Sequence, residues 1–210
     1  MKNYLFDLDG LLINSEELYL AANRVYFRQF DFDFTETLHK QGTGKKFAEW
    51  IKTVTDIDLD GATILSERNK VFFELAKSKL HLMPGARELL DYAKQHGKTA
   101  LVTSSNNDYV KFVFDHTGID SYFEIVIAGD QVTKGKPDPE GYLKAASLLQ
   151  VEPSTCVVFE DAPNGVEAGK NAGMKVVAVP SPYVIGDPIF KTADIVINTL
   201  TDYIKNEDKL

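Results

Sequence analysis

Acidic and hydroxyl side chains stand close to the ends of short apolar runs in this 210-residue sequence, and a lysine stands just before a predicted helix. They are Asp7, Asp9, Thr103, Ser104, Ser105, Lys136, Glu160 and Asp161. Ligands of open α/β sheets bind outside the carboxyl ends of the strands, so we expect these side chains to converge on one site. Carboxylate, hydroxyl and lysine groups together suit phosphoryl transfer, in which the protein positions an in-line attack and neutralises charge on the phosphoryl oxygens.

The acids of this set require a counter-charge. Alternate residues that leave a strand point the same way, so Asp7 and Asp9 can face one small volume, and Gly10 gives the sharp exit that exposes them. With Glu160 and Asp161 added, the site needs a divalent cation, and an all-oxygen ligand set with room for water suits Mg²⁺. We therefore expect these acids to hold Mg²⁺. Of the two adjacent ones, Asp161 is the stronger candidate, because one of a pair often orients the loop instead.

A carboxylate can also be the nucleophile of phosphoryl transfer and form an aspartyl-phosphate. We expect Asp7 to attack phosphorus, and Asp9 to protonate the leaving oxygen and then activate water. Thr103 would donate a hydrogen bond to the phosphoryl group, and Lys136 would offset its charge. This scheme assigns a role to each catalytic candidate.

Six short apolar runs, rich in β-branched residues, predict buried strands. They are 4–6, 99–102, 123–127, 156–159, 176–179 and 195–197. Stretches with helical spacing separate them, such as Ala86 to His96, which follows Pro84-Gly85 and is followed by Gly97. Strands separated by helices imply parallel crossovers. The sequence therefore predicts an α/β fold with a Rossmann-like parallel sheet and helices on both faces.

The stretch from Ser15 to Leu80 has helical spacing and no convincing strand. It carries three apolar faces, formed by Leu18, Ala21, Ala22 and Val25, by Phe47, Trp50, Ile51 and Val54, and by Val71, Phe72, Leu75 and Ala76. Three such faces can close a small bundle. We predict a core domain of residues 1–14 and 82–210, interrupted by a helical domain of residues 15–81. The two crossings between these domains would form a hinge.

Composition limits the possible partners. The net charge of −8 argues against a nucleic-acid partner. The single cysteine, Cys156, allows no intrachain disulfide and no zinc-binding thiolate cluster, which suits a reducing, cytoplasmic location. No apolar run approaches membrane-spanning length, so we expect no membrane association. The expected partner is a small phosphorylated metabolite, and the expected state is a monomer or a weak homodimer.

Four motifs of the chain resemble, in order, those of the haloacid dehalogenase superfamily. They are Phe6-Asp7-Leu8-Asp9-Gly10, Thr103, Lys136 and Glu160-Asp161. The resemblance covers essentially the whole chain. The helical insertion resembles the small helical cap of that superfamily's β-phosphoglucomutase-like branch, in which the cap closes over the site.

Longer stretches resemble most closely the group that contains pseudouridine 5′-phosphatase and glycerol-3-phosphatases. They are 9–12, 82–86, 135–139 and 158–166. This resemblance implies a phosphatase whose substrate is a sugar phosphate, a nucleoside or pseudouridine phosphate, or glycerol phosphate. It also places a substrate-selecting loop at Gly42 to Lys46, where Lys45 or Lys46 would meet a polar or anionic part of the substrate. Ser104 and Asn107 are further candidate substrate-binding residues.

Two other functions remain open alternatives. A phosphomutase would use the same core, but the family's mutases carry a histidine in the first cap helix where this chain has Tyr19. That departure favours hydrolysis over return of the phosphoryl group. A phospho-accepting signalling domain also places acids, a hydroxyl and a lysine at strand ends. It needs no helical insertion, however, and no second aspartate placed like Asp9 to protonate an alcohol.

The segment 56–67 matches the bare EF-hand pattern of acids, glycine and a distal glutamate. Thr63 occupies the eighth place, where an apolar side chain usually packs against a paired loop. We therefore interpret this segment as a helix start capped by Asp58 or Asp60. The four histidines lack metal-ligand spacing, and we expect none of them to enter the mechanism.

Overall fold

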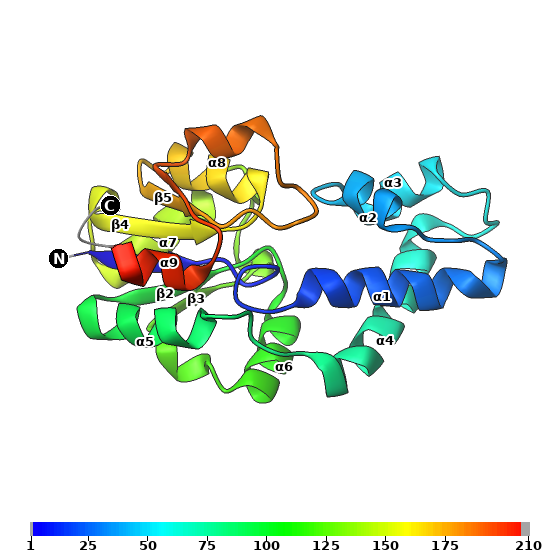
Figure 1. Ribbon diagram of the computed structural model, residues 1–210, viewed down its shortest axis with the longest axis horizontal. Coiled ribbons are helices and arrows are strands. Elements are labelled where there is room, and N and C mark those ends of the chain that lie inside the picture. Colours follow the sequence, from blue (N-terminus) through cyan, green and yellow to red (C-terminus); the bar gives the residue numbers. More distant parts are fainter. Residues whose placement is uncertain (1, 207–210) are drawn as a thin grey trace. The chain divides into compact units, whose positions relative to one another are not determined.

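The computed structural model describes residues 2–206, and the chain divides into two compact units. One unit comprises Met1–Ile13 together with His81–Leu210, and the other comprises Asn14–Leu80. We call them the core unit and the cap unit (Figure 1). Among the described residues, no helix combines the length and the apolar composition needed to cross a membrane.

The core unit contains a six-stranded, fully parallel sheet, which confirms the predicted α/β class. Its strands are β1 (Asn3–Phe6), β2 (Thr99–Val102), β3 (Ile125–Ile127), β4 (Cys156–Glu160), β5 (Lys175–Ala178) and β6 (Ile195–Val196). Their order across the sheet is β3-β2-β1-β4-β5-β6. Leu5 of β1 lies in register with Ala100 of β2 and with Val158 of β4. The carboxyl ends of β1, β2 and β4 are therefore neighbours at one edge of the sheet.

Helices cover both faces of this sheet, as the crossover pattern predicts. They are α5 (Ala86–His96), α6 (Asn107–Thr117), α7 (Glu140–Leu149), α8 (Pro163–Asn171) and α9 (Leu200–Asn206), with short 3₁₀ turns at 120–122, 129–131, 153–155 and 188–192. Leu5 belongs to a buried cluster with Ala146 of α7 and Val166 of α8. Phe159 points to the opposite face, where its ring meets Tyr203 of α9 edge to face at 4.9 Å. Successive strand residues thus serve two separate cores.

The cap unit is helical, with α1 (Ser15–Phe27), α2 (Glu36–Gly42), α3 (Phe47–Trp50) and α4 (Gly61–Lys79), and 3₁₀ turns at 28–30 and 51–53. Leu18 and Ala22 of α1 are buried, as predicted. Val25 is 52% exposed, so its assignment to the apolar face was wrong. Tyr26 and Phe27, at the end of α1, are buried instead and pack edge to face at 5.1 Å. Larger aromatic side chains one and two residues further on displace valine from the core.

Local polar contacts fix the ends of two cap helices. The Thr35 hydroxyl accepts a hydrogen bond from the Leu38 amide at the start of α2. The Asp60 carboxylate accepts one from the Thr63 amide at the start of α4, at 2.9 Å. These contacts satisfy amides that the helix itself leaves unpaired. Asp60 is therefore the cap of α4, as one of the two residues proposed from the sequence.

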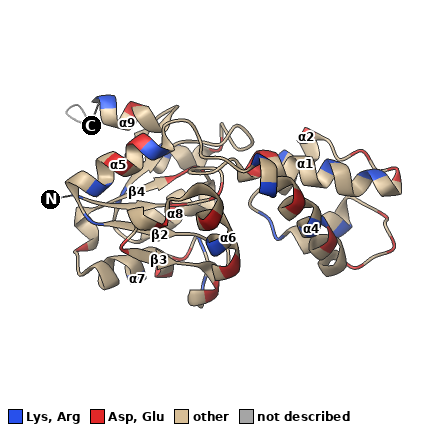
Figure 2. Cartoon of the chain, turned by 90° about the horizontal axis from the view of Figure 1, so that it is seen from below, with Lys and Arg blue, Asp and Glu red and all other residues tan. Residues whose placement is uncertain are grey.

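Charged side chains of both signs are spread over the helices of the cap unit (Figure 2). Lys70 and Lys77 of α4 pair with acids three residues earlier, each with an N–O distance of 2.6 Å. Lys40 of α2 pairs with Glu36 at 2.9 Å. Such exposed pairs stabilise a helix by only about 0.2–0.5 kcal/mol each. These pairs lie on the solvent-exposed side of the cap helices.

Candidate active site

Asp7 lies directly after β1, at the sheet edge where the strand ends meet. Its amide donates a hydrogen bond to the carbonyl of Phe159 in β4, which extends the ladder by one residue and fixes the Asp7 backbone. Gly10 then adopts a φ of 76°, in the left-handed region that glycine enters without strain. The chain turns sharply there, and the Gly10 amide donates to the Ile13 carbonyl. The expected turn after Asp9 is present.

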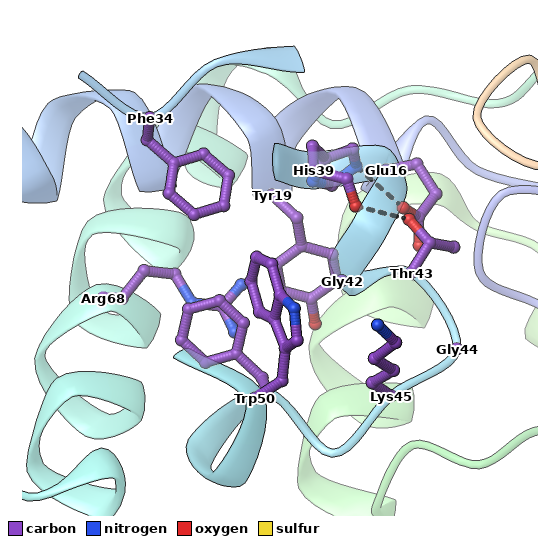
Figure 3. Close-up of a pocket in the computed structure, with 11 residues that line it drawn as sticks. Glu16, Tyr19, Phe34, His39, Gly42, Thr43, Gly44, Lys45, Trp50 and Arg68 are labelled. Carbon is purple, nitrogen blue, oxygen red and sulfur yellow. Dashed lines mark hydrogen bonds and ion pairs between the residues drawn. The ribbon is translucent and has the colours of Figure 1, made fainter. Parts of the chain in front are cut away.

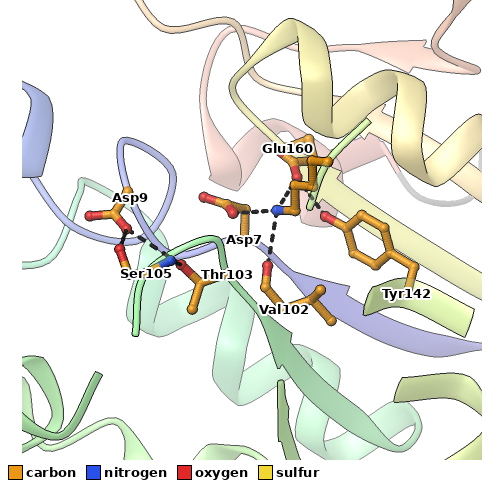
Figure 4. A network of polar contacts seen from close by, with 8 residues as sticks. Asp7, Asp9, Val102, Thr103, Ser105, Tyr142 and Glu160 are labelled. Carbon is orange, nitrogen blue, oxygen red and sulfur yellow. Dashed lines mark hydrogen bonds and ion pairs between the residues drawn. The ribbon is translucent and has the colours of Figure 1, made fainter. Parts of the chain in front are cut away.

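Lys136 contacts the ends of three neighbouring strands. Figure 4 shows its partners Asp7, Val102 and Glu160. Its Nζ donates to Asp7 Oδ1 at 2.5 Å, to Glu160 Oε1 at 2.6 Å and to the Val102 carbonyl oxygen at 3.0 Å. Glu160 Oε1 also accepts a 2.5 Å hydrogen bond from the hydroxyl of Tyr142 in α7. The side chains of Asp7, Glu160 and Tyr142 are buried and that of Lys136 is 11% exposed, so water screens the charges among them only weakly.

The protonation behaviour of the site follows from this burial. Burial raises the pKa of Asp7 to about 8, because the loss of water outweighs the attraction of Lys136, and Glu160 and Asp9 add repulsion. Burial by itself would lower the pKa of Lys136, but the carboxylates of Asp7 and Glu160 outweigh it and hold this pKa well above its usual value. Burial, and then the charge of Glu160, raise the pKa of Tyr142. Lys136 is therefore a cation and Tyr142 a neutral donor at neutral pH.

Asp9 lies beside this network with partners of its own. Its Oδ2 accepts a 2.8 Å hydrogen bond from the Ser105 hydroxyl and lies 3.4 Å from the Thr103 hydroxyl. Its Oδ1 accepts a 2.7 Å hydrogen bond from the hydroxyl of Tyr109 in α6. The Thr103 Oγ1 also accepts from the Ser105 amide at 3.1 Å, which organises the turn after β2. The carboxylate of Asp9 is thus oriented by hydroxyl groups, with no cation among these contacts.

Three buried carboxylates of the core unit could hold a metal ion. Asp7, Glu160 and Asp161 each offer an oxygen, and these oxygens lie within 4.8 Å of one another. An all-oxygen set suits a hard divalent cation and fits poorly to softer metals. The side chain of Asp9, which we also expected as a ligand, is outside this group. The residues present therefore fit a divalent cation.

The remaining core candidates lie nearby but are less buried. Ser104 is exposed and lines a small cavity of about 80 Å³ together with Thr103 and Lys136. Asn107 is exposed at the start of α6, where its side-chain amide donates to Asp130 Oδ1 at 2.8 Å. This contact occupies one of its amide hydrogens.

Burial raises the pKa of the Cys156 thiol to about 11, so this residue has no thiolate character at neutral pH.

The cap unit contains a separate pocket of about 180 Å³ (Figure 3). Aromatic rings and a buried cation form much of its lining. The Arg68 guanidinium lies 4.6 Å from the centre of the Tyr19 ring and 4.4 Å from the centre of the Phe47 ring. Lys45 also lines this pocket, and Figure 3 shows its side chain reaching up from the loop that contains Gly44. The loop expected to select substrate thus borders a real cavity.

Polar groups close one side of this cap pocket. His39 Nε2 and Glu16 Oε2 lie 3.0 Å apart, and His39 is buried. Tyr19, which stands where the family's mutases carry histidine, stacks on Phe72 with ring centres 4.2 Å apart. Its ring is therefore a packing surface of the pocket as well as a neighbour of Arg68.

The acidic segment after α3 serves as a loop and helix cap. The Lys52 ammonium donates to the carbonyl oxygens of Ile57 and Leu59 at 2.6 and 2.8 Å. Two carbonyl oxygens of the EF-hand-like segment therefore already accept hydrogen bonds from a lysine ammonium. Among the described residues, the only cluster of three or more acids, histidines or cysteines with metal-binding geometry is the one in the core unit.

Two tyrosines of the site had not been anticipated from the sequence. Tyr142 shares a helix face with Ala145, Ala146 and Leu149, a spacing that is typical of an ordinary core helix. Tyr109 likewise precedes the buried Val110 and Val113. The only sequence signal was a hydroxyl on an otherwise apolar face, because a buried hydroxyl needs a partner.

Comparison with known proteins gives consistent matches. Residues 4–179 match the family model described as haloacid dehalogenase-like hydrolase. A phosphorylated carbohydrates phosphatase of Thermotoga maritima is 34% identical over 183 residues, which cover 83% of each chain. A Drosophila melanogaster protein named as a pseudouridine-5′-phosphatase is 33% identical to this chain over 189 residues, which cover 85% of this chain and 81% of that protein. A solved structure assigned as a β-phosphoglucomutase of Thermotoga maritima has a TM-score of 0.85, 29% identity and full coverage of both chains.

Proposed function

Because the chain belongs to the haloacid dehalogenase-like hydrolase family and its named relatives include phosphatases, we propose that it hydrolyses a small phosphomonoester with Mg²⁺ as cofactor. In this proposal Asp7 is the nucleophile and forms an aspartyl-phosphate. The observation that carries it is the contact between Lys136 Nζ and Asp7 Oδ1, at 2.5 Å, beside a cluster of three buried acids. A cation at this point can offset the charge of both the nucleophile and the phosphoryl group.

We assign the metal to Asp7 and Asp161, with Glu160 as a further neighbour of the same cluster. Asp9, which we also considered a ligand from the sequence, has both side-chain oxygens engaged by the hydroxyl groups of Ser105 and Tyr109. When bound, a divalent cation here neutralises charge on the transferred phosphoryl group and orients it. Lys136 supplies a second positive charge, and the Thr103 hydroxyl supplies a hydrogen bond to the phosphoryl oxygens.

Asp9 is the general acid and base of this proposal. In the first step, its carboxyl group gives a proton to the leaving alcohol oxygen as the P–O bond breaks and Asp7 bonds to phosphorus. In the second step, its carboxylate accepts a proton from the water that attacks the aspartyl-phosphate. Hydrogen bonds from Ser105 and Tyr109 orient its two oxygens for these transfers. The products are the alcohol, inorganic phosphate and the free enzyme.

We propose that the cap pocket recognises the part of the substrate that is not transferred. Arg68 and Lys45 provide cationic groups in its lining, and the Tyr19 and Trp50 side chains provide both apolar surface and hydrogen-bond donors. A polar or anionic leaving group suits this chemistry better than an alkyl chain. Ser104 and Asn107 of the core unit remain proposed contacts to the same substrate.

The test is phosphate release from a panel of sugar phosphates, nucleoside monophosphates, pseudouridine 5′-phosphate and glycerol phosphates, with and without Mg²⁺. We expect Mg²⁺-dependent release that Asp7→Asn lowers by at least about a thousandfold. Asp115→Asn is the matched control, since this exposed acid forms a surface ion pair with Lys111. Undiminished turnover by Asp7→Asn would overturn the assignment of the nucleophile.

A mutase is the second candidate, because a structure assigned as a β-phosphoglucomutase matches the full length of this chain at 29% identity. It would convert a sugar 1-phosphate into the 6-phosphate without net release of phosphate. Phosphorus NMR of β-glucose 1-phosphate incubated with the protein separates the two reactions. We expect inorganic phosphate as the product, because the Tyr19 ring offers no imidazole to relay a proton.

A further inference from the structure

The carboxylate of Glu160 is held from two sides. It is the last residue of β4 and is 1% exposed. Its Oε1 accepts two hydrogen bonds, at 2.6 Å from the Lys136 ammonium and at 2.5 Å from the Tyr142 hydroxyl. Both donors use the same oxygen, so the position of that oxygen sets the position of the lysine charge.

Gly165 in α8 packs against this carboxylate. A Cβ atom at Gly165 would lie 1.9 Å from both Cδ and Oε1 of Glu160 and 2.1 Å from its Oε2. Because no side chain could share that space, the helix backbone approaches the carboxylate more closely than any other residue would allow. Glu160 is therefore confined by the α8 backbone and its two hydrogen-bond donors.

Tyr142 combines a buried ring with a hydroxyl that points at Glu160 (Figure 4). The residue is 1% exposed, and its ring centre lies 5.1 Å from Lys136 Nζ. Phenylalanine would fill the same apolar space without the cost of burying a hydroxyl. The hydroxyl is therefore useful for its bond to a carboxylate, which is stronger than a bond between neutral groups.

We propose that Tyr142 is a positioning residue, which acts through Glu160 to hold the Lys136 ammonium against Asp7. This inference rests on the proposed function, in which Lys136 offsets the charge of the transferred group. Loss of the hydroxyl leaves Glu160 with one donor in place of two, so both Glu160 and Lys136 gain freedom. The effect falls on the transition state, where the phosphoryl charge and the lysine must be aligned.

The test compares Tyr142→Phe with Tyr92→Phe. Tyr92 is a matched control in the same unit, because its buried hydroxyl has no hydrogen-bond partner among residues 2–206. We expect Tyr142→Phe to lower kcat about five- to fiftyfold while KM changes less than about twofold. Inhibition by vanadate should weaken by a similar factor and inhibition by inorganic phosphate much less. Equal kinetics of the two variants, or a rise in KM alone, would overturn the proposal.

A double-mutant cycle separates a positioning role from a general loss of packing. If Tyr142 acts through Glu160, Tyr142→Phe should change kcat less than about twofold in a Glu160→Ala background, in which the acceptor of the Tyr142 hydroxyl is gone. Independent, multiplying effects of the two substitutions would show that Tyr142 acts elsewhere. The melting temperature of each variant is measured alongside, and a fall confined to Tyr142→Phe that accounts for its lost activity would also overturn the proposal.

A readout independent of turnover distinguishes failure of this inference from failure of the proposed function. The buried ammonium of Lys136 should give a slowly exchanging proton–nitrogen NMR signal, identified by its loss in Lys136→Met. We expect Tyr142→Phe to shift this signal and speed its exchange with water, and Tyr92→Phe to leave it unchanged. An unaltered Lys136 signal in Tyr142→Phe would refute the positioning role, whether or not the protein releases phosphate.

Discussion

The core site and the cap pocket use charge in opposite ways. In the core unit, the Lys136 ammonium lies 2.5 Å from an oxygen of Asp7 and 2.6 Å from an oxygen of Glu160, so these groups share one charge network. In the cap pocket, the Arg68 guanidinium lies between two aromatic rings, and Lys45 is exposed on a loop. The first arrangement tolerates little change because removal of any member leaves a buried charge. In the second arrangement, a single residue that lines the pocket can be substituted without leaving a buried charge. This tolerance suits selection among substrates.

Of the substitutions that test this comparison, Lys136→Met should have the largest effect on activity. It leaves two buried carboxylates facing each other, and we expect kcat to fall about a hundred- to a thousandfold. Steady-state kinetics of the folded variant provides the measurement. Lys134→Met is the control, since Lys134 is 72% exposed and pairs only loosely with Asp138, at 3.8 Å. Retention of a tenth or more of the activity would mean that Lys136 is not part of the charge balance.

The raised pKa of Asp7 predicts that metal binding depends on pH. Below about 8 the metal-free Asp7 carboxyl holds a proton, which a divalent cation must displace. We therefore expect the apparent affinity for Mg²⁺ to rise by up to about tenfold per pH unit from pH 6 to 8 and then to level off. Titration calorimetry in two buffers of different ionisation enthalpy measures both the affinity and the released proton. The same affinity at pH 6 and pH 8 would contradict the assignment.

Lys45→Ala should have a smaller effect, and one of a different kind. Because Lys45 borders the cap pocket, we expect KM for an anionic or polar substrate to rise about three- to tenfold with little change in kcat. Lys70→Ala serves as the matched control, since Lys70 is 68% exposed and pairs with Glu67 on the surface of the same unit. A fall in kcat alone would place Lys45 in the chemistry, and so remove the distinction between the two regions.

Asp60→Ala should change stability and leave the chemistry untouched. Asp60 caps α4 through the Thr63 amide and hydroxyl, at 2.9 and 2.6 Å. We expect the free energy of unfolding of the cap unit to fall by about 1 kcal/mol, with unchanged kcat for the best substrate. Urea denaturation followed by fluorescence of Trp50, the single tryptophan, measures this loss in the cap unit itself. A loss of kcat would show that the cap helix matters to catalysis beyond its stability.

The sequence predicted the core unit better than the cap unit, for a physical reason. Residues 86–96 and 99–102 have the predicted bounds, because proline, glycine and β-branched residues set local backbone preferences. Asp7 and Lys136 are 129 residues apart, yet their contact follows from the rule that strand ends meet at one edge. No comparable rule exists for a small helical bundle, where the exposed Val25 lies beside the buried Tyr26.

The residues that sequence reasoning missed are those whose role depends on a side chain's direction. Tyr109 and Tyr142 have ordinary helical spacing, and only the folded structure shows which hydroxyl reaches Asp9 and which reaches Glu160. No specific place could be assigned to His39 from the sequence; it is buried and lies 3.0 Å from Glu16 of a different helix. Pairs of this kind form across elements, where periodicity carries no information.

The three hydrogen bonds of Lys136 also have a consequence for how the chain matures. They reach the ends of β1, β2 and β4, whose contacting residues lie 129, 34 and 24 positions away along the chain, respectively. All three acceptors of the ammonium are in place only when β1, β2 and β4 are paired, since a missing strand removes one of them. The reactive centre is therefore complete only after these distant parts of the chain have come together, and we expect a partly folded chain to lack activity.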